Sequence, residues 1–385
     1  MPSVLPDDVL LARLVAFDTT SDRSNLDLVA FIADYLDRPG LDVSTHHSAA
    51  GDKATLVVRT GPAPTDERDG LVLNGHLDTV PADEPEWTGN PFTLRTIDDR
   101  LVARGACDMK GFDAIAVNVM AATDPDRLAS PLALILTYDE EVGSLGAQAF
   151  IATADVESFP RAVLIGEPTS LRAVRMHKGH LKMRITTHGR SAHSGSPHLG
   201  HNAVHDMIPV LAALDELRRA FEGERVETSA FFPDVPNPLL GVMRIRGGTA
   251  LNVIPDRCVV EVGIRLLPGQ ASDATIARVR CAVEDAGAPA EVEIINDNPP
   301  MLLDEASSVH RTLCGVLDQS TTRGVSFSSD AGWLARAGFE CVLCGPGSIT
   351  VAHRPDEFVP RDEMSRARTI VERLVEQCCG HAERT

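Results

Sequence analysis

Three short apolar runs in this 385-residue chain end in residues that bind metals or exchange protons. The runs are LVLNGHLD (71–78), LALILTYDEE (132–141) and AVLIGEP (162–168), and their polar residues are His76, Asp78, Glu140, Glu141 and Glu167. Continuous apolar runs of this length are typical of strands buried in a parallel sheet. Because open α/β sheets bind ligands at the carboxyl ends of their strands, we expect these polar side chains to form one site.

Two further segments carry residues of the same chemical type. Asp108 lies in ARGACDMKG (103–111), directly before a predicted helix that starts at Met109, where it is a suitable N-cap. His353 ends the segment CGPGSITVAH (344–353). The whole pattern predicts a two-metal hydrolytic site assembled from the ends of several strands.

The charges of the candidate ligands match two divalent cations. Three carboxylates and one bridging hydroxide would neutralise the two ions, and the two histidines would bind in their neutral form. This balance matters because uncompensated charge is costly in a buried site. Imidazole and carboxylate ligands suit zinc, and also cobalt or manganese. The predicted ligands are His76, Asp108, Glu141, Glu167 and His353.

Two acidic residues are expected to support these ligands. Asp78 follows His76 by two positions, which on a strand end places both on the same side. It can then accept the second N–H of the imidazole. Glu140 and Glu141 are adjacent, so one can bind metal while the other takes a proton from the attacking water. We expect Glu140 to be that general base.

Each motif alone has an ordinary interpretation. A single His-x-Asp, an Asp-Glu-Glu run or a glutamate before proline is more often part of a solvated surface than of a catalytic site. The joint occurrence of all three after apolar strands favours the site.

The length of the chain predicts two domains. Strands and helices alternate up to about residue 179, which favours an α/β layer. From HLKMRITTHG (180–189) onward, half-exposed strands and two helices follow in the order β-α-β-β-α. We expect an inserted α+β domain at 180–290 and a discontinuous α/β domain with a mixed sheet at 1–179 and 291–385.

The acidic composition narrows the possible partners. A formal net charge of −19 disfavours a nucleic acid or an acidic membrane surface, because both would be repelled. No apolar run approaches the roughly 18 residues that span a bilayer, and the first residues lack the pattern of a signal peptide. We therefore expect a cytoplasmic protein that acts on a small molecule.

Several segments together resemble the M20 family of metallopeptidases and amidohydrolases, nearly from end to end. The matching segments are GHLDTVP (75–81), GACDMKG (105–111), DEEVGSLGA (139–147), GEPT (166–169), HKGHLKMRITTHGRSAHSGSPHLGHNAV (177–204), NVIPD (252–256) and CGPGSITVAHRPDEF (344–358). The resemblance implies a zinc-dependent (or cobalt-dependent) amide hydrolase that binds two metal ions per subunit.

The resemblance also implies a role for each matching residue. Asp108 would bridge the two ions; His76 and Glu167 would complete one metal position, and Glu141 and His353 the other. Glu140 would be the general base, with Asp78 supporting His76.

The segment 180–290 resembles the ferredoxin-like lid or dimerisation domain of the family, which implies a homodimer. His193 would reach the active site of the partner subunit and stabilise the oxyanion. Asn252 and Arg265 would contact the substrate, Arg265 through a carboxylate, which its guanidinium can bind with two parallel hydrogen bonds.

Within the family, the segments 14–26, 190–204 and 344–358 most resemble the acetylornithine deacetylases. This implies hydrolysis of N2-acetyl-L-ornithine to L-ornithine and acetate, in arginine biosynthesis. Succinyl-diaminopimelate desuccinylase, another N-acyl-amino-acid deacylase and a dipeptidase remain open as alternatives, because one pocket residue can change such a preference. A catalytically silent binding protein would have lost Glu140 or a ligand, and none is lost.

Overall fold

The computed structural model describes residues 4–63 and 70–380, and the chain divides into two compact units. The first unit contains Met1–Arg175, Leu303–Thr322 and Ser329–Thr385; the second contains Met176–Leu302 and Arg323–Ser328. Residues 1–3, 64–69 and 381–385 of the predicted first domain lie outside the described residues.

A mixed six-stranded sheet forms the centre of the first unit, in the order β1-β2-β6-β3-β7-β14. Its strands β6, β3, β7 and β14 are parallel to one another, whereas β1 and β2 pair antiparallel at one side. The parallel strands are buried because their residues are almost all apolar. The strand bounds are β1 (Asp42–His47), β2 (Ala54–Thr60), β3 (Leu71–His76), β6 (Leu132–Thr137), β7 (Ala162–Pro168) and β14 (Glu340–Gly345).

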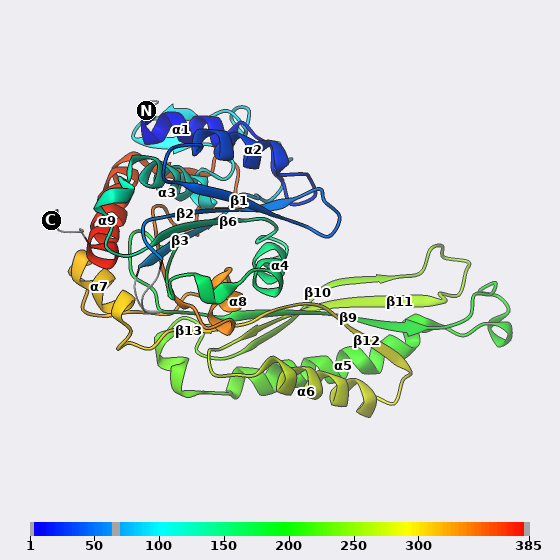
Figure 1. Ribbon diagram of the computed structural model, residues 1–385. Helices are drawn as coiled ribbons and strands as arrows, with labels where there is room; N and C mark the ends of the chain where they lie inside the picture. Colours follow the sequence, from blue (N-terminus) through cyan, green and yellow to red (C-terminus); the bar gives the residue numbers. More distant parts are fainter. Residues whose placement is uncertain (1–3, 64–69, 381–385) are drawn as a thin grey trace. The chain divides into compact units, whose positions relative to one another are not determined.

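Helices cover both faces of this sheet, as the mixed α/β fold predicted from the sequence requires (Figure 1). Helix α3 is buried along almost its whole length, because it packs between the sheet and the helices α1 and α9. Helices α4 and α8 lie on the opposite face. The helix bounds are α1 (Asp7–Val15), α2 (Leu26–Tyr35), α3 (Gly111–Ala122), α4 (Leu145–Thr153), α7 (Ser308–Leu317), α8 (Ala331–Arg336) and α9 (Arg361–Cys379).

A three-stranded sheet completes the first unit, in the order β15-β5-β4. Its strands are β4 (Arg95–Ile97), β5 (Arg100–Val102) and β15 (Phe358–Pro360).

The second unit contains a four-stranded antiparallel sheet, in the order β10-β11-β9-β12. Helices α5 and α6 pack on one face of it, and their apolar side chains share a core with Met183, Ile185 and Val260. The order β-α-β-β-α-β is that of a ferredoxin-like fold. The bounds are β9 (Gly179–His188), α5 (Ala203–Gly223), β10 (Leu239–Gly247), β11 (Arg257–Leu266), α6 (Ser272–Asp285) and β12 (Ala290–Asn298), with the short pair β8 (Met176–His177) and β13 (Met301–Leu302).

The second unit is longer than the predicted insertion of 180–290. Strand β12 pairs with β9 along its length and so continues the second sheet, although the sequence analysis assigned this segment to the first domain. Within residues 4–63 and 70–380, no helix combines the length and apolarity needed to cross a bilayer.

Candidate metal centre

Four predicted site residues lie where three parallel strands of the first unit end. His76 is the last residue of β3, Glu167 is the next-to-last residue of β7, and the pair Glu140 and Glu141 follows β6. Strand β3 pairs in parallel with both β6 and β7, so their carboxyl ends meet at one edge of the sheet. This edge is where an open α/β sheet binds its ligands.

Asp108 stands between the two histidines. The Nε2 atom of His76 is 3.1 Å from Oδ1 of Asp108, and the Nε2 atom of His353 is 3.3 Å from Oδ2. Each carboxylate oxygen of Asp108 therefore faces a different imidazole. This is the arrangement expected of a carboxylate that bridges two metal ions.

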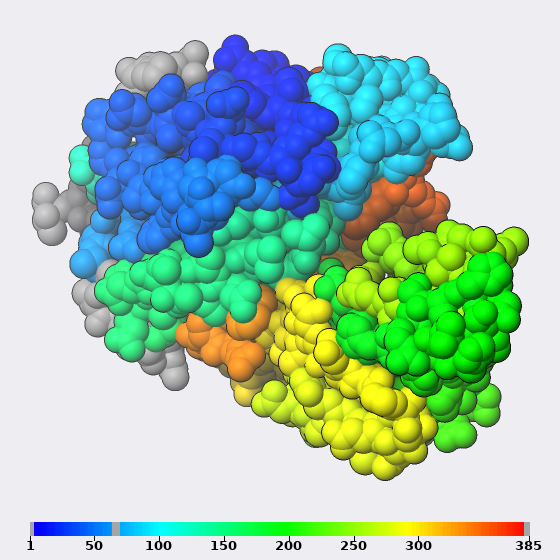
Figure 2. Space-filling view, turned by 90° about the vertical axis from the view of Figure 1, so that its right-hand side faces the viewer, coloured from blue at the N-terminus to red at the C-terminus, as the bar shows by residue number. Residues whose placement is uncertain are grey.

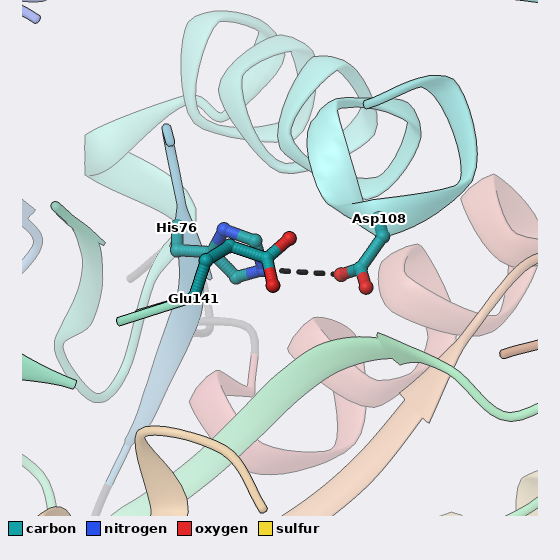
Figure 3. A group of neighbouring side chains, drawn as sticks. All are labelled: His76, Asp108 and Glu141. Atoms are coloured by element: carbon teal, nitrogen blue, oxygen red, sulfur yellow. Dashed lines mark hydrogen bonds and ion pairs between the residues drawn. The ribbon is translucent and has the colours of Figure 1, made fainter. Parts of the chain in front are cut away.

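Glu141 belongs to the same cluster. Its Oε2 atom is 3.0 Å from Nε2 of His353. One ligand atom each of His76, Asp108 and Glu141 lie within 4.8 Å of one another, and these side chains point toward a common centre (Figure 3). Donors of these types at this spacing fit divalent zinc, cobalt or manganese.

The remaining predicted ligand, Glu167, is buried beside them, with only 3% of its surface exposed. Burial, together with the charge of Asp108, raises its pKa well above the ordinary value. Burial and the charge of Asp108 likewise raise the pKa of Glu141 to about 7. Several buried carboxyls thus repel one another, which is the electrostatic problem that bound cations would relieve.

Asp108 is not the helix N-cap that the sequence predicts. Helix α3 begins at Gly111, after a kinked segment (Ala106–Lys110) in which Asp108 has the non-helical angles φ −124° and ψ 93°. Its backbone amide donates to Glu357 and its side chain faces the histidines. The need to orient this carboxylate toward the cluster outweighs a capping role.

Asp78 contacts both the Glu140–Glu141 turn and the imidazole of His76. Its carboxylate accepts hydrogen bonds from the backbone amides of Glu140 (3.0 Å) and Glu141 (3.2 Å) and from the hydroxyl of Ser21 (2.7 Å). The Nδ1 atom of His76 lies 3.1 Å from the backbone carbonyl of Asp78 and 3.5 Å from its carboxylate. The main contacts of this carboxylate are therefore with the turn that carries the two glutamates.

Glu140 lies at the start of that turn. Burial, together with the charge of Glu167, raises its pKa well above the ordinary value. The buried hydroxyl of Ser144 lies 3.4 Å from its Oε1 atom. A carboxylate with a raised pKa is better matched to accepting a proton near neutral pH.

A buried lysine that is not among the predicted site residues fixes the turn from the other side. The ammonium of Lys53 pairs with the carboxylate of Asp139 and donates to the backbone carbonyl of Ser21. Asp139 has a φ of 55°, so this ion pair holds a left-handed residue directly before Glu140. No sequence signal marks Lys53, because a single lysine before a strand usually lies on the surface.

Glu357 joins the segments that carry Asp108 and His353. One of its oxygens accepts the amides of Cys107 (2.9 Å) and Asp108 (3.1 Å), and the other accepts from Arg104 at 2.8 Å. The side chains of Glu357 and Arg104 are each only 1% exposed. Like Lys53, Glu357 supports the site although no local sequence pattern predicts it.

The substitution Glu357→Gln should destabilise the protein and loosen the metal centre. Removing one charge of a buried pair costs about 3–5 kcal/mol, so we expect urea denaturation to show a drop of about 3 kcal/mol in the free energy of unfolding. Metal affinity, followed by competition with a chelator, should fall by about tenfold or more. Glu372→Gln is the matched control, because Glu372 forms an exposed pair with Arg368 on α9. Equal stability of the two variants would contradict this assignment.

Protons compete with metal at the two histidines. Burial disfavours a charged His76, but hydrogen bonds to Asp108 and Asp78 outweigh it and raise its pKa well above the ordinary value. Hydrogen bonds to Asp108 and Glu141 raise the pKa of His353 to about 11. In the absence of metal the imidazole of His353 therefore keeps its proton at neutral pH, and the neighbouring carboxylates also favour the protonated form of His76.

Metal affinity should consequently increase with pH. Each displaced proton contributes about a tenfold gain per pH unit between pH 5 and pH 8, which metal-binding calorimetry in buffers of different ionisation enthalpy would measure as proton release. The contribution of His353 to the stability of the metal-free protein has the opposite pH dependence. Because its folded-state pKa exceeds the unfolded value of about 6.5, its stabilising contribution is full below that pH and is lost as the pH rises through about 11. A pH-independent metal affinity would contradict this picture.

The other predicted site residues belong to the second unit. His193 and Val253 form an isolated β-bridge, and the amide of Ser194 donates to the carbonyl of Asn252, so His193 and Asn252 lie on two paired segments. His193 and Asn252 are both exposed. Figure 2 looks onto the end of this unit, where residues 189–202 (green) lie beside residues 247–256 (yellow-green). Arg265 lies on β11, with Nη1 3.4 Å from the hydroxyl of Ser328.

Residues 72–377 match the sequence model of peptidase family M20/M25/M40. The chain belongs to this family. It is 33% identical over 372 residues to an acetylornithine deacetylase of Pectobacterium carotovorum subsp. carotovorum (strain PC1), covering 95% of this chain and 94% of that one. The M20 family assignment and this relative together make the chain a metal-dependent hydrolase of amide bonds.

Solved structures of the M20 family share the fold at low sequence identity. An M20 family metallo-carboxypeptidase from Sulfolobus solfataricus is 16% identical, with a TM-score of 0.79 and coverage of 97% and 99% of the two chains. A dinuclear metal-binding M20 peptidase from Bacillus subtilis is 14% identical, with a TM-score of 0.66 and coverage of 98% and 99%. These similarities confirm the predicted fold.

Proposed function

We propose that the protein removes the acyl group from an N-acyl amino acid, with N2-acetyl-L-ornithine as the substrate and L-ornithine and acetate as the products. The observation that supports this most is the cluster of Asp108 with His76, His353 and Glu141, near the buried carboxyl of Glu140. The similarity to acetylornithine deacetylases over 95% of the chain favours this substrate. We further propose a cytoplasmic role in arginine biosynthesis.

Asp108 would hold two divalent ions, zinc or cobalt, together with the other four candidate ligands, His76, Glu141, Glu167 and His353. When bound, such ions polarise the substrate carbonyl and lower the pKa of water to about 7. Glu140 takes a proton from the attacking water as its oxygen bonds to the carbonyl carbon. It then gives that proton to the amide nitrogen as the C–N bond breaks, so that the carboxylate of Glu140 is restored.

Three residues of the second unit are proposed to serve the substrate. The guanidinium of Arg265 suits the α-carboxylate of the amino acid. Asn252 supplies an amide that can donate to the substrate, and His193 stabilises the oxyanion in the active site of a partner subunit. This last role requires a homodimer, which we propose as the functional form.

Mixing two inactive variants tests the shared site. If His193 acts in the partner's active site, a mixture of Glu140→Gln and His193→Ala chains forms heterodimers in which one site has both groups intact. We expect each variant alone to be nearly inactive and the mixture to recover activity after subunit exchange. A mixture no more active than its two components would place His193 with its own subunit or outside catalysis. The exposed His205→Ala serves as the control for histidine removal.

A substrate panel tests the proposed reaction. Zinc- or cobalt-loaded protein would be assayed with N2-acetyl-L-ornithine, N-succinyl-diaminopimelate, several N-acetyl amino acids and dipeptides. A strong preference for acetylornithine that a chelator abolishes would support both substrate and chemistry. Preference for another acyl amino acid or a dipeptide would retain the chemistry and reject the substrate. Activity that persists after removal of the metal would reject the chemistry.

A further inference from the structure

The open face of the second unit's sheet carries an alternating row of charges. Helices α5 and α6 cover the other face, so side chains that alternate with the core residues of β9 and β11 face away from them. Across four strands, Arg244 pairs with Glu261 (3.1 Å), Glu261 with Arg184 (3.0 Å), and Arg184 with Glu293 (3.0 Å). In this row each acidic side chain lies beside an arginine.

Two neighbouring arginines are not neutralised in this way. Arg246 on β10 lies opposite Val259 in the register, and Arg257 lies opposite His188. Both arginines are exposed. Within residues 4–63 and 70–380, neither guanidinium has a hydrogen bond or an ion pair. The charge of Arg246 helps to lower the pKa of Glu261, but no acidic side chain of the described residues is hydrogen-bonded to either guanidinium, so both can donate to an anion.

The free arginines line a cavity of about 570 Å³ together with Arg184 and Arg244. Glu261 and Asp256 are its two acidic lining residues, so the arginines outnumber them, in a chain whose net charge is −19. The hydroxyl of Thr249 and the Gly247–Gly248 turn complete one side. All these residues belong to the second unit, whereas the candidate metal ligands belong to the first.

We propose that this cavity binds a small dianion, a dicarboxylate or a phosphate-bearing metabolite, between Arg246 and Arg257. A planar guanidinium offers two parallel N–H donors that match either carboxylate or phosphate oxygens. The cavity volume lies in the range typical of small-molecule sites. A nucleic acid is disfavoured, because the net negative charge of the chain would repel its phosphates. The proposal does not depend on the substrate of the metal centre.

Calorimetric titration of the full-length, metal-loaded protein tests the site. The first probe is 1,3-benzenedisulfonate, a dianion that does not chelate metals, and the second and third are succinate and inorganic phosphate, each compared with potassium chloride at equal ionic strength. We expect each of the three anions to show saturable binding that is stronger than the binding of chloride. The double variant Arg246→Gln/Arg257→Gln should weaken it by at least about tenfold, the loss expected on removing a charge-assisted hydrogen bond. Tighter binding of succinate than of phosphate would identify a dicarboxylate ligand, and the reverse a phosphorylated one.

A control variant separates this site from general charge effects. Arg219→Gln removes an exposed arginine that pairs with Asp215 on α5, and its dianion affinity should equal that of the parent protein. Saturation no stronger than with chloride, or equal affinity in the parent and the double variant, would overturn the proposal. If the double variant instead changed self-association in sedimentation experiments without any saturable dianion binding, the arginines would belong to an interface between copies.

Discussion

Glu140→Gln is expected to lower kcat by about 10²–10⁴-fold while the protein still binds its metal ions. The amide keeps the size and polarity of the side chain but cannot accept the proton of the attacking water. The backbone amide of Glu140, which anchors the turn on Asp78, is unchanged by the substitution. The measurements are single-turnover hydrolysis of the acyl amino acid and metal analysis of the same preparation.

The control for this variant is Glu157→Gln, which changes an exposed glutamate of the first unit. It should match the parent protein in both measurements. If Glu140→Gln retained activity within about tenfold, a different group would have to accept the proton. If metal content fell together with activity, Glu140 would be a ligand rather than the base.

Asp108→Asn is expected to abolish both metal binding and turnover. The substitution removes the negative charge that faces His76 and His353 at the same time, and an amide is a poor bridging ligand. We expect the affinity for both ions to fall by more than about 100-fold, which exceeds the effect of losing a residue that only supports a ligand. Isothermal titration of the metal-free protein with zinc and cobalt, followed by activity assays, would measure both effects.

Asp98→Asn is a matched control for this substitution. Asp98 is exposed in the turn between β4 and β5 and has a φ of 53°, a conformation that asparagine also adopts. It should bind metal as the parent protein does. If Asp108→Asn lost only one of the two ions, Asp108 would bind a single ion and would not bridge the pair.

The strand-end residues of the site could be predicted because their local sequence defines their position. His76 and Glu167 end long apolar runs that have no alternative to a buried strand, and parallel strands bring their ends to one edge. The roles of these residues in metal binding still rest on the family resemblance. Their proximity in the fold is what the apolar pattern alone could predict.

Residues that act through tertiary contacts could not be predicted in this way. Lys53 and Glu357 are single charged residues with no apolar periodicity around them, and only the folded chain buries them. Strand β12 was assigned to the first domain because its exposed edge position leaves a weak apolar pattern. The conformation of Asp108 likewise depends on contacts with distant residues, so local capping rules mislead there.

The discontinuity of the first unit has a consequence for protein synthesis. Strand β14 and helix α9 complete this unit, and both are translated after the whole second unit. His353 likewise emerges from the ribosome long after His76, Asp108 and Glu141. While more than a hundred residues are added, the nascent chain must therefore keep a sheet that lacks only its edge strand β14, and a cluster of acidic side chains that lacks His353. The set of candidate metal ligands is therefore complete only once residue 353 has been synthesised, and a chain released before that residue would lack one of them.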